Sequence, residues 1–166
     1  MLKKIKSNNY LSIFFLIFTL VSCDSSRVFD DYYSMNEDSW SNNDTVVFPF
    51  AINDTVNKHD LFINIRNNNK YPFSNLFLIT HLKFPDGQKI IDTLEYDMTD
   101  KSGKFLGEGF SSIKENKLYY KENISFPISG NYSVAIFQAM RKSNEINGIK
   151  YLEGVTDVGF RIEKIE

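Results

Sequence analysis

Apolar and polar residues follow two different patterns along this chain. Near the start, lysines at positions 3, 4 and 6 precede a run of mostly apolar residues over 11–20. Beyond residue 44, apolar side chains instead alternate with polar ones, as at Val46, Phe48, Phe50 and Ile52. The apolar run is typical of a secretory signal peptide and is too short for a membrane-spanning helix. The alternation has the period of a half-buried β-strand.

The alternating part of the chain predicts a series of β-strands. Residues 75–98 form the best-defined hairpin, because the sequence Pro-Asp-Gly at 85–87 favours a tight turn. Pro49 lacks a backbone N–H, which predicts a sheet edge or a bulge at that position. The polar segment 112–117 predicts a loop or a single helical turn. The predicted strands cover residues 45–52, 61–67, 75–84, 89–98, 118–126, 131–140 and 154–165.

The spacing of the strands predicts the fold class. Turn signals recur at intervals of about 8–12 residues, and no stretch has the period of an amphipathic helix. We therefore predict an all-β fold, an antiparallel β-sandwich with Greek-key or jelly-roll connections. The predicted parts are a lipoprotein signal peptide (1–22), a lipidated N-terminus and tether (23–43) and the sandwich domain (44–166). Candidates for docking of the tether on the domain are Val28, Phe29, Tyr32, Tyr33 and Trp40.

The apolar run leads directly into a lipidation motif. Leu20, Val21, Ser22 and Cys23 match the bacterial lipobox, in which the cysteine thiol accepts a diacylglycerol and a peptidase cleaves the chain before it. Cys23 is the only cysteine, which favours this interpretation over an ordinary secretory signal with a chance cysteine or an uncleaved helix. We therefore expect the mature chain to begin at Cys23 and to be held to a membrane by acyl chains.

Composition and charge restrict the function further. The chain has 19 basic and 21 acidic residues, and cleavage would remove three of the lysines, so the mature protein is acidic. It has no basic patch of the kind that binds nucleic acid. With its cysteine lipidated, it has no means of forming a disulfide or a cysteine-based metal site. We expect no cofactor and no nucleic-acid partner.

No set of catalytic or metal-binding residue types in the sequence outweighs a structural explanation. His59 lies in a polar loop and His81 on a different predicted strand, and neither has the spacing of a zinc motif. Glu95 and Asp97 share a strand face, where two carboxylates would bind Ca²⁺ or act as acid and base, but a solvated face is the simpler explanation. The glycines of residues 103–109 lack a phosphate-binding spacing. We predict no enzymatic activity, no metal and no small-molecule substrate.

Two surface features suggest further roles. Tyr119 and Tyr120 are candidates for stacking on sugar rings, although neighbours on a strand point to opposite faces and only one would be exposed. A glycan-binding lipoprotein of the cell envelope is therefore the alternative function. The tripeptide Asp-Thr-aliphatic occurs at Thr45, Thr55 and Thr93, and it resembles the O-glycosylation acceptor of exported Bacteroidota proteins.

Long sequence blocks also carry a family resemblance. They are SSRVFDDY after the lipobox, LFINIRNNNKYPFSNLFLI, DTLEYDM, GKFLGEGFSSIKENKLYYKENISFP, QAMR and EGVTDVGFRIEK. These blocks span nearly the whole chain and resemble the gliding motility-associated lipoprotein family GldH. The resemblance implies a membrane lipoprotein required for gliding of Bacteroidota cells, in a machinery bound up with type IX secretion. It implies no enzymatic activity, and Cys23 is the one functional residue that carries over.

The resemblance and the lipobox together give an expected location and expected partners. We expect a lipid-anchored protein of the cell envelope with its body in the periplasm, in contact with other gliding and secretion proteins. Asp24 after the lipidated cysteine favours the inner membrane under the sorting rule of enteric bacteria, but sorting rules differ in Bacteroidota, and we expect the outer membrane. A lipid-tethered sandwich without a catalytic set is suited to holding a partner through strand edges or aromatic loops.

Overall fold

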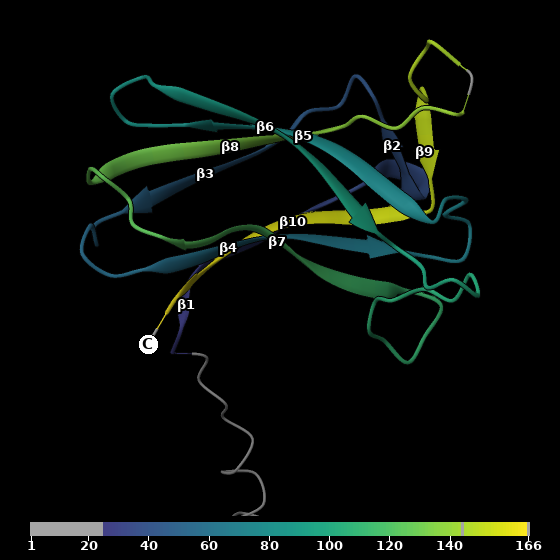
Figure 1. The fold of residues 1–166 in the computed structure, drawn as a ribbon, viewed down its shortest axis with the longest axis horizontal. Coiled ribbons are helices and arrows are strands. Elements are labelled where there is room, and N and C mark those ends of the chain that lie inside the picture. Colours follow the sequence, from purple (N-terminus) through teal and green to yellow (C-terminus); the bar gives the residue numbers. More distant parts are fainter. Residues whose placement is uncertain (1–24, 144, 166) are drawn as a thin grey trace, which may run out of the picture.

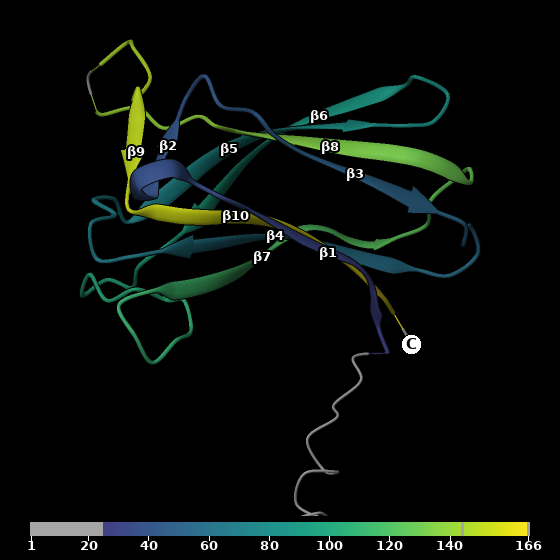
Figure 2. The ribbon, with the colours of Figure 1, turned by 180° about the vertical axis from the view of Figure 1, so that it is seen from behind.

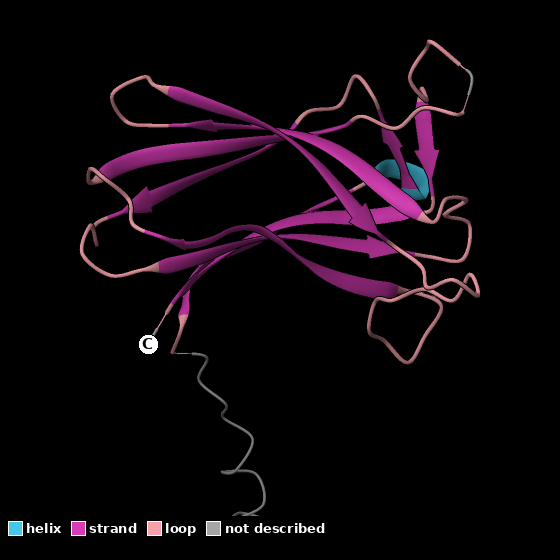
Figure 3. Cartoon of the chain, in the orientation of Figure 1, coloured by secondary structure: helices cyan, strands magenta, loops and turns pink. Residues whose placement is uncertain are grey.

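In the computed structural model, which describes residues 25–143 and 145–165, the chain forms two antiparallel sheets packed face to face (Figures 1 and 3). We call them the β1 sheet, with strand order β1-β10-β4-β7, and the β3 sheet, with strand order β3-β8-β5-β6. A small two-stranded sheet pairs β2 with β9. The predicted all-β sandwich is confirmed. The elements are β1 (Arg27–Ser34), the 3-10 helix η1 (Asn36–Asp38), β2 (Ser39–Ser41), β3 (Val46–Ile52), β4 (His59–Asn67), β5 (Asn75–Lys83), β6 (Lys89–Asp97), β7 (Lys114–Ile124), β8 (Gly130–Gln138), β9 (Tyr151–Glu153) and β10 (Val155–Lys164).

The connections between the long strands give a jelly roll. Apart from the short strands β2 and β9, consecutive strands lie in opposite sheets, except for β5 and β6, which form a hairpin within one sheet. The first strand, β1, lies beside the last, β10, in a four-stranded sheet. This arrangement of eight strands in two sheets is the jelly-roll topology, one of the two connections that the sequence predicts.

Alternation along the strands places one face of each sheet in the core. In β3, the even-numbered residues from Val46 to Ile52 are buried and those between them are exposed. The ring of Phe50 lies 5.5 Å from that of Phe160 in the opposite sheet and 5.6 Å from that of Tyr132 in the neighbouring strand. The strand β3 lies at a sheet edge, as Pro49 predicts.

The predicted hairpin over residues 75–98 is confirmed. The strands β5 and β6 pair from Asn75 opposite Asp97 to Lys83 opposite Lys89. At the turn, Gly87 has a φ of +88° and its N–H donates to the carbonyl of Phe84 at 3.0 Å. Glycine takes this left-handed conformation without the strain that a side chain would introduce.

The strands follow the long axis, so the loops gather at two ends (Figure 1). The start of β1 and the C-terminal residues lie together at one end, where the N–H of Lys164 donates to the carbonyl of Ser26 at 2.8 Å. The β3–β4 loop joins them, since the N–H of Ile165 donates to the carbonyl of Lys58 at 2.9 Å. We call this the N-terminal end. The opposite end, the loop end, carries β2, β9, the β6–β7 loop and the β8–β9 loop (Figure 2).

The predicted tether is largely folded into the sandwich, which corrects the domain boundary at residue 44. The strand β1 pairs with β10 along its length, and β2 pairs with β9. Trp40 is fully buried, and the ring of Phe29 contacts aromatic rings of both sheets. The acidic composition of the segment was misleading, because Asp30 forms an ion pair of 2.7 Å with Arg161 of the neighbouring strand. The sandwich therefore begins at β1.

The segment 112–117 also differs from its prediction, because β7 begins within it at Lys114. Its polar composition is typical of a loop, yet Asn116 is buried. The side-chain amide of Asn116 donates to the carbonyl of Ile65 at 3.0 Å and to the side-chain oxygen of Asn67 at 2.9 Å. A buried polar group is tolerated when it is hydrogen-bonded in this way, so the strand continues through it.

Candidate functional site

The predicted lipidation site lies outside the described residues. Leu20, Val21, Ser22 and Cys23 all precede the first described residue, and their role as a lipobox stays a prediction. The connection from Cys23 to the folded body is short, because the first strand starts at Arg27. Even a fully extended chain from Cys23 to Arg27 reaches only about 14 Å. Over 25–143 and 145–165, no helix combines the length and apolar character needed to cross a membrane.

The three predicted glycosylation sites are exposed and lie apart from one another. Thr45 directly precedes β3, Thr55 lies in the β3–β4 loop, and Thr93 lies on the outward face of β6. Each side chain is therefore accessible to a modifying enzyme. Glycosylation itself stays a prediction.

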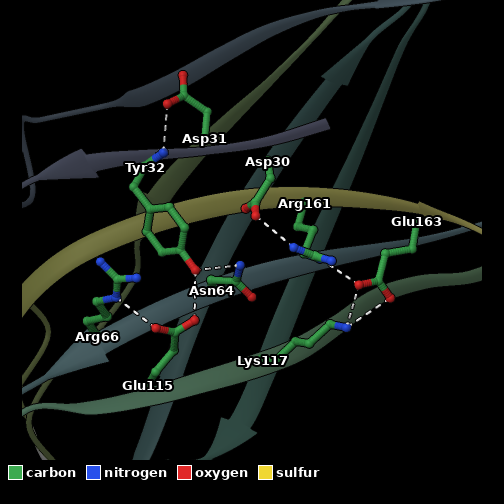
Figure 4. A network of polar contacts seen from close by, with 9 residues as sticks. All are labelled: Asp30, Asp31, Tyr32, Asn64, Arg66, Glu115, Lys117, Arg161 and Glu163. Atoms are coloured by element: carbon green, nitrogen blue, oxygen red, sulfur yellow. Dashed lines mark hydrogen bonds and ion pairs between the residues drawn. The ribbon is translucent and has the colours of Figure 1, made fainter. Parts of the chain in front are cut away.

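The outward face of the β1 sheet carries a network of polar side chains drawn from all four strands (Figure 4). One half centres on Tyr32, whose hydroxyl donates to Glu115 at 2.8 Å and accepts from the side-chain amide of Asn64 at 2.9 Å. Arg66 pairs with Glu115 at 2.8 Å, and its guanidinium carbon lies 4.2 Å from the centre of the Tyr32 ring. Burial and then the bond to Glu115 raise the pKa of Tyr32 to about 12, so its hydroxyl keeps its proton at neutral pH.

The other half of the network centres on Arg161 and Glu163 of β10 (Figure 4). Arg161 pairs with Asp30 of β1 at 2.7 Å and also with Glu163, which in turn accepts from Lys117 of β7 at 2.8 Å. Burial alone would raise the pKa of Glu163, but hydrogen bonds from Lys117 and Arg161 outweigh it and lower the pKa. Because its charges are paired with one another across the strands, we interpret the network as a clamp that holds β1 to its sheet.

Sequence reasoning missed this network. The signal available was the alternation in β4, where Asn64 and Arg66 fall on the face opposite Leu61, Ile63 and Ile65. That period identifies an outward polar face. It does not identify the partners, because Tyr32 and Glu115 come from strands far away in the sequence.

A groove lies on the outward face of the β3 sheet, beside the β8–β9 loop. Its floor includes the side chains of Phe77 and Ile79 in β5 and of Thr93 in β6, and Ile146 of the loop contributes to one wall. Ile146 is 96% exposed. Charged residues around the groove are Arg141, Lys142 and Glu145. The lining therefore combines apolar side chains with charged ones, as protein-binding surfaces do.

The titratable residues considered for catalysis do not converge. His59 is buried in the β1 sheet, where burial lowers its pKa, whereas His81 lies on the outward face of the β3 sheet. Glu95 and Asp97 share the outward face of β6, and Glu95 accepts a hydrogen bond from the side chain of Asn75 at 2.9 Å. Among the residues that the structure describes, no three side chains of the metal-binding types come together.

The two neighbouring tyrosines point to opposite faces, as expected for a strand. Tyr119 is 53% exposed on the outward face of the β1 sheet, and its ring centre lies 4.6 Å from that of Phe62. Tyr120 is buried, and its hydroxyl donates to Asp92 at 2.9 Å. Tyr119 therefore has an exposed ring edge or face, whereas Tyr120 is part of the core.

Comparison with known proteins identifies the family. The family model described as GldH lipoprotein matches residues 27–162. The chain is 56% identical to the "Gliding motility lipoprotein GldH homolog" of Christiangramia forsetii over 92% of this chain and 95% of that protein. It is 50% identical to the "Gliding motility lipoprotein GldH" of Flavobacterium johnsoniae over 87% of this chain and 89% of that protein.

Solved structures add only a distant likeness. The VP2 subviral particle of infectious bursal disease virus matches with 18% identity and a TM-score of 0.39, over 87% of this chain and 34% of the viral chain. This similarity is too low to support an argument, and the family rests on the sequence matches. With a family model matched over most of its length and two relatives at 50% identity or more, the chain belongs to the GldH lipoprotein family.

Proposed function

We propose that the protein is a membrane-anchored lipoprotein required for gliding motility. It acts as a non-catalytic assembly component that links the membrane to the gliding and type IX secretion machinery. Family membership supports the motility role, because both relatives are named gliding motility lipoproteins. The lipid anchor is attached at Cys23, and the body lies in the periplasm at the outer membrane.

The observation that carries the assembly role is the groove on the outward face of the β3 sheet. The β3 sheet is the layer of the sandwich farther from the start of β1 (Figure 1). Phe77 and Ile79 in the groove face outward, although the core of the sandwich lies on the other side of their sheet. Outward apolar side chains on a sheet that needs only one apolar face support a contact with another protein. The partner presents apolar side chains to this floor.

Cross-linking in living cells tests the assembly role. The tagged protein is captured after cross-linking, and we expect gliding and secretion components among the recovered proteins. I146D places a charge at the groove and should lose these partners. V56D is the matched control, because Val56 is also highly exposed, at 84%, but lies in the β3–β4 loop at the N-terminal end. Recovery of no gliding or secretion component with the wild-type protein would count against the proposal.

Glycan binding is the second candidate, and the exposed ring of Tyr119 supports it. Stacking on a sugar needs one accessible aromatic face, and Tyr119 is half exposed on the strand face that also carries Lys117. Titration of the purified protein with cell-envelope oligosaccharides would change its tyrosine fluorescence if this candidate holds. The Y119A variant should abolish that change.

A further inference from the structure

We propose that the β6–β7 loop is a second membrane contact, so that the protein lies on the bilayer with its β1 sheet towards the lipid. This inference rests on the proposed lipid anchor at Cys23 and adds an orientation to it. The contact is made by the apolar residues of segment 106–113, which are Leu106, Phe110 and Ile113.

These three side chains are unusually exposed. Leu106 is 55% exposed, Ile113 is 41% exposed, and Phe110 is 114% exposed, which means that the whole residue has more free surface than in a reference peptide. Removing apolar surface from water is favourable, so a fully exposed phenylalanine with two exposed apolar neighbours marks a surface that is covered by something else.

The loop is held in a shape that keeps Phe110 exposed. Glu108 and Glu115 exchange two backbone hydrogen bonds of 2.8 Å, which close the loop at its base. Gly109 has a φ of +145°, and a side chain there would place its Cβ 2.5 Å from the carbonyl oxygen of Ile113. The ammonium group of Lys114 also donates to the carbonyl of Gly109. These hydrogen bonds fix the conformation of the turn that carries Phe110. Its side chain therefore does not fold back onto the core.

The loop projects on the same side of the sandwich as the start of β1. In Figures 1 and 2, both lie at the lower edge of the molecule, below the β1 sheet. Leu106 and Phe110 line a hollow together with Glu115 and Lys117, whose side chains belong to the outward face of that sheet. The β6–β7 loop and the start of β1 thus lie on one side of the protein. The loop is at the loop end, and the start of β1 is at the N-terminal end.

The short connection to Cys23 sets the position of the bilayer. Because Arg27 lies within about 14 Å of the lipidated residue along the chain, the start of β1 must remain close to the lipid headgroups. A second apolar point on the same side then lays the β1 sheet along the membrane. The bilayer is favoured over a protein as the occupant, because the chain itself fixes the side on which the bilayer lies.

Fluorescence quenching in vesicles tests this orientation. The full-length lipidated F110W protein is incorporated into vesicles of phosphatidylethanolamine and phosphatidylglycerol with brominated acyl chains. The native Trp40 is fully buried, so the wild-type protein provides the background signal. We expect the added indole to emit at shorter wavelength and to be quenched by the bromines. I146W is the matched control, because Ile146 is also almost fully exposed but lines the groove on the outward face of the β3 sheet, and its indole should not be quenched.

The outcomes separate this inference from the proposed function. Failure of the wild-type protein to float with the vesicles would contradict the lipid anchor. A protein that floats, but whose F110W indole is unquenched, would overturn the second contact and leave the anchor intact. Equal quenching of F110W and I146W would overturn the orientation, as would a photo-cross-linker at position 110 that labels a protein in cells and not lipid.

Discussion

The ring of Tyr32 lies directly over Gly159 of the adjacent strand. A Cβ at Gly159 would lie 2.7 Å from two ring carbons of Tyr32 and 3.1 Å from the carbonyl oxygen of Asp31. The absence of a side chain at this position lets the ring lie flat on the sheet, and its hydroxyl then reaches Glu115 and Asn64. The polar network that holds β1 to its sheet therefore requires a glycine at position 159.

Replacing Gly159 should loosen this clamp. In Gly159→Ala the new methyl group displaces the Tyr32 ring, and overpacking of this kind destabilises a protein by about 1–3 kcal/mol. Urea unfolding of the purified protein measures the change. Gly148→Ala is the control, because a Cβ there would lie 3.5 Å from its nearest neighbour, an ordinary contact, and the free energy of unfolding should change by less than about 0.5 kcal/mol. Equal effects of the two substitutions would contradict the role of Gly159.

The hydroxyl of Tyr32 should contribute separately from its ring. Tyr32→Phe keeps the ring over Gly159 but removes the hydrogen bonds to Glu115 and Asn64, at an expected cost of about 1–2 kcal/mol. Relative to the wild type, hydrogen exchange should then be accelerated at the backbone amides of β1. The other strands of the β1 sheet should be accelerated less. Tyr33→Phe on the same strand, where the side chain is half exposed, should leave exchange unchanged. Unaltered exchange in Tyr32→Phe would mean that the network does not hold β1.

Stability should fall in mildly acidic solution because of His59. This side chain is buried, with its ring 5.4 Å from that of Phe126, and burial lowers its pKa. Nearby Asp54 acts in the opposite direction, and Lys164 acts with the burial. The unfolded chain therefore binds a proton at His59 more readily, so this contribution to stability is present above about pH 6.5 and is lost as the pH falls towards the lowered pKa.

Urea midpoints at about pH 7.5 and about pH 5.5 measure this dependence. His59→Phe should have a smaller difference between the two midpoints than the wild type. His81→Gln, which changes the exposed-face histidine of the β3 sheet, should keep the wild-type difference. An unchanged difference in His59→Phe would assign the acid sensitivity to other groups.

Glycosylation and partner binding should exclude each other at Thr93. The side chain of Thr93 lies in the groove, whereas Thr45 and Thr55 lie elsewhere on the surface. A sugar on Thr93 would fill the space that we propose for the partner. Mass spectrometry of cross-linked complexes should therefore find sugar on Thr45 and Thr55 but not on Thr93. A sugar on Thr93 within the captured complex would place the partner on another surface.

The parts of the fold that the sequence predicted are those controlled by local patterns. Alternation over β3 and the Pro-Asp-Gly turn at 85–87 act over a few residues, and both were predicted correctly. The strand β1 was not, because Asp30 and Asp31 gave it the composition of a linker. Asp30 is paired in the structure by Arg161, which is remote in the sequence and becomes a neighbour only through the pairing of β1 with β10.

The candidate surfaces were predicted less well for the same reason. The outward face of β5 was visible as an alternation, but the groove also requires the β8–β9 loop to lie beside Ile79 and Thr93. The exposure of Phe110 depends on the bridge between Glu108 and Glu115 and on the conformation of Gly109. The lipobox is a linear motif, so the lipidation of Cys23 could be predicted without knowledge of the fold, and it stays a prediction.

Gliding of single cells provides the most direct test of a membrane-anchored role in motility. The gene is deleted in a gliding host and then restored either as the wild type or as Cys23→Ala, with protein levels checked in both strains. We predict that the deletion stops gliding on glass, that the wild type restores it, and that Cys23→Ala does not. Gliding that survives the deletion, or that Cys23→Ala restores fully, would contradict the account.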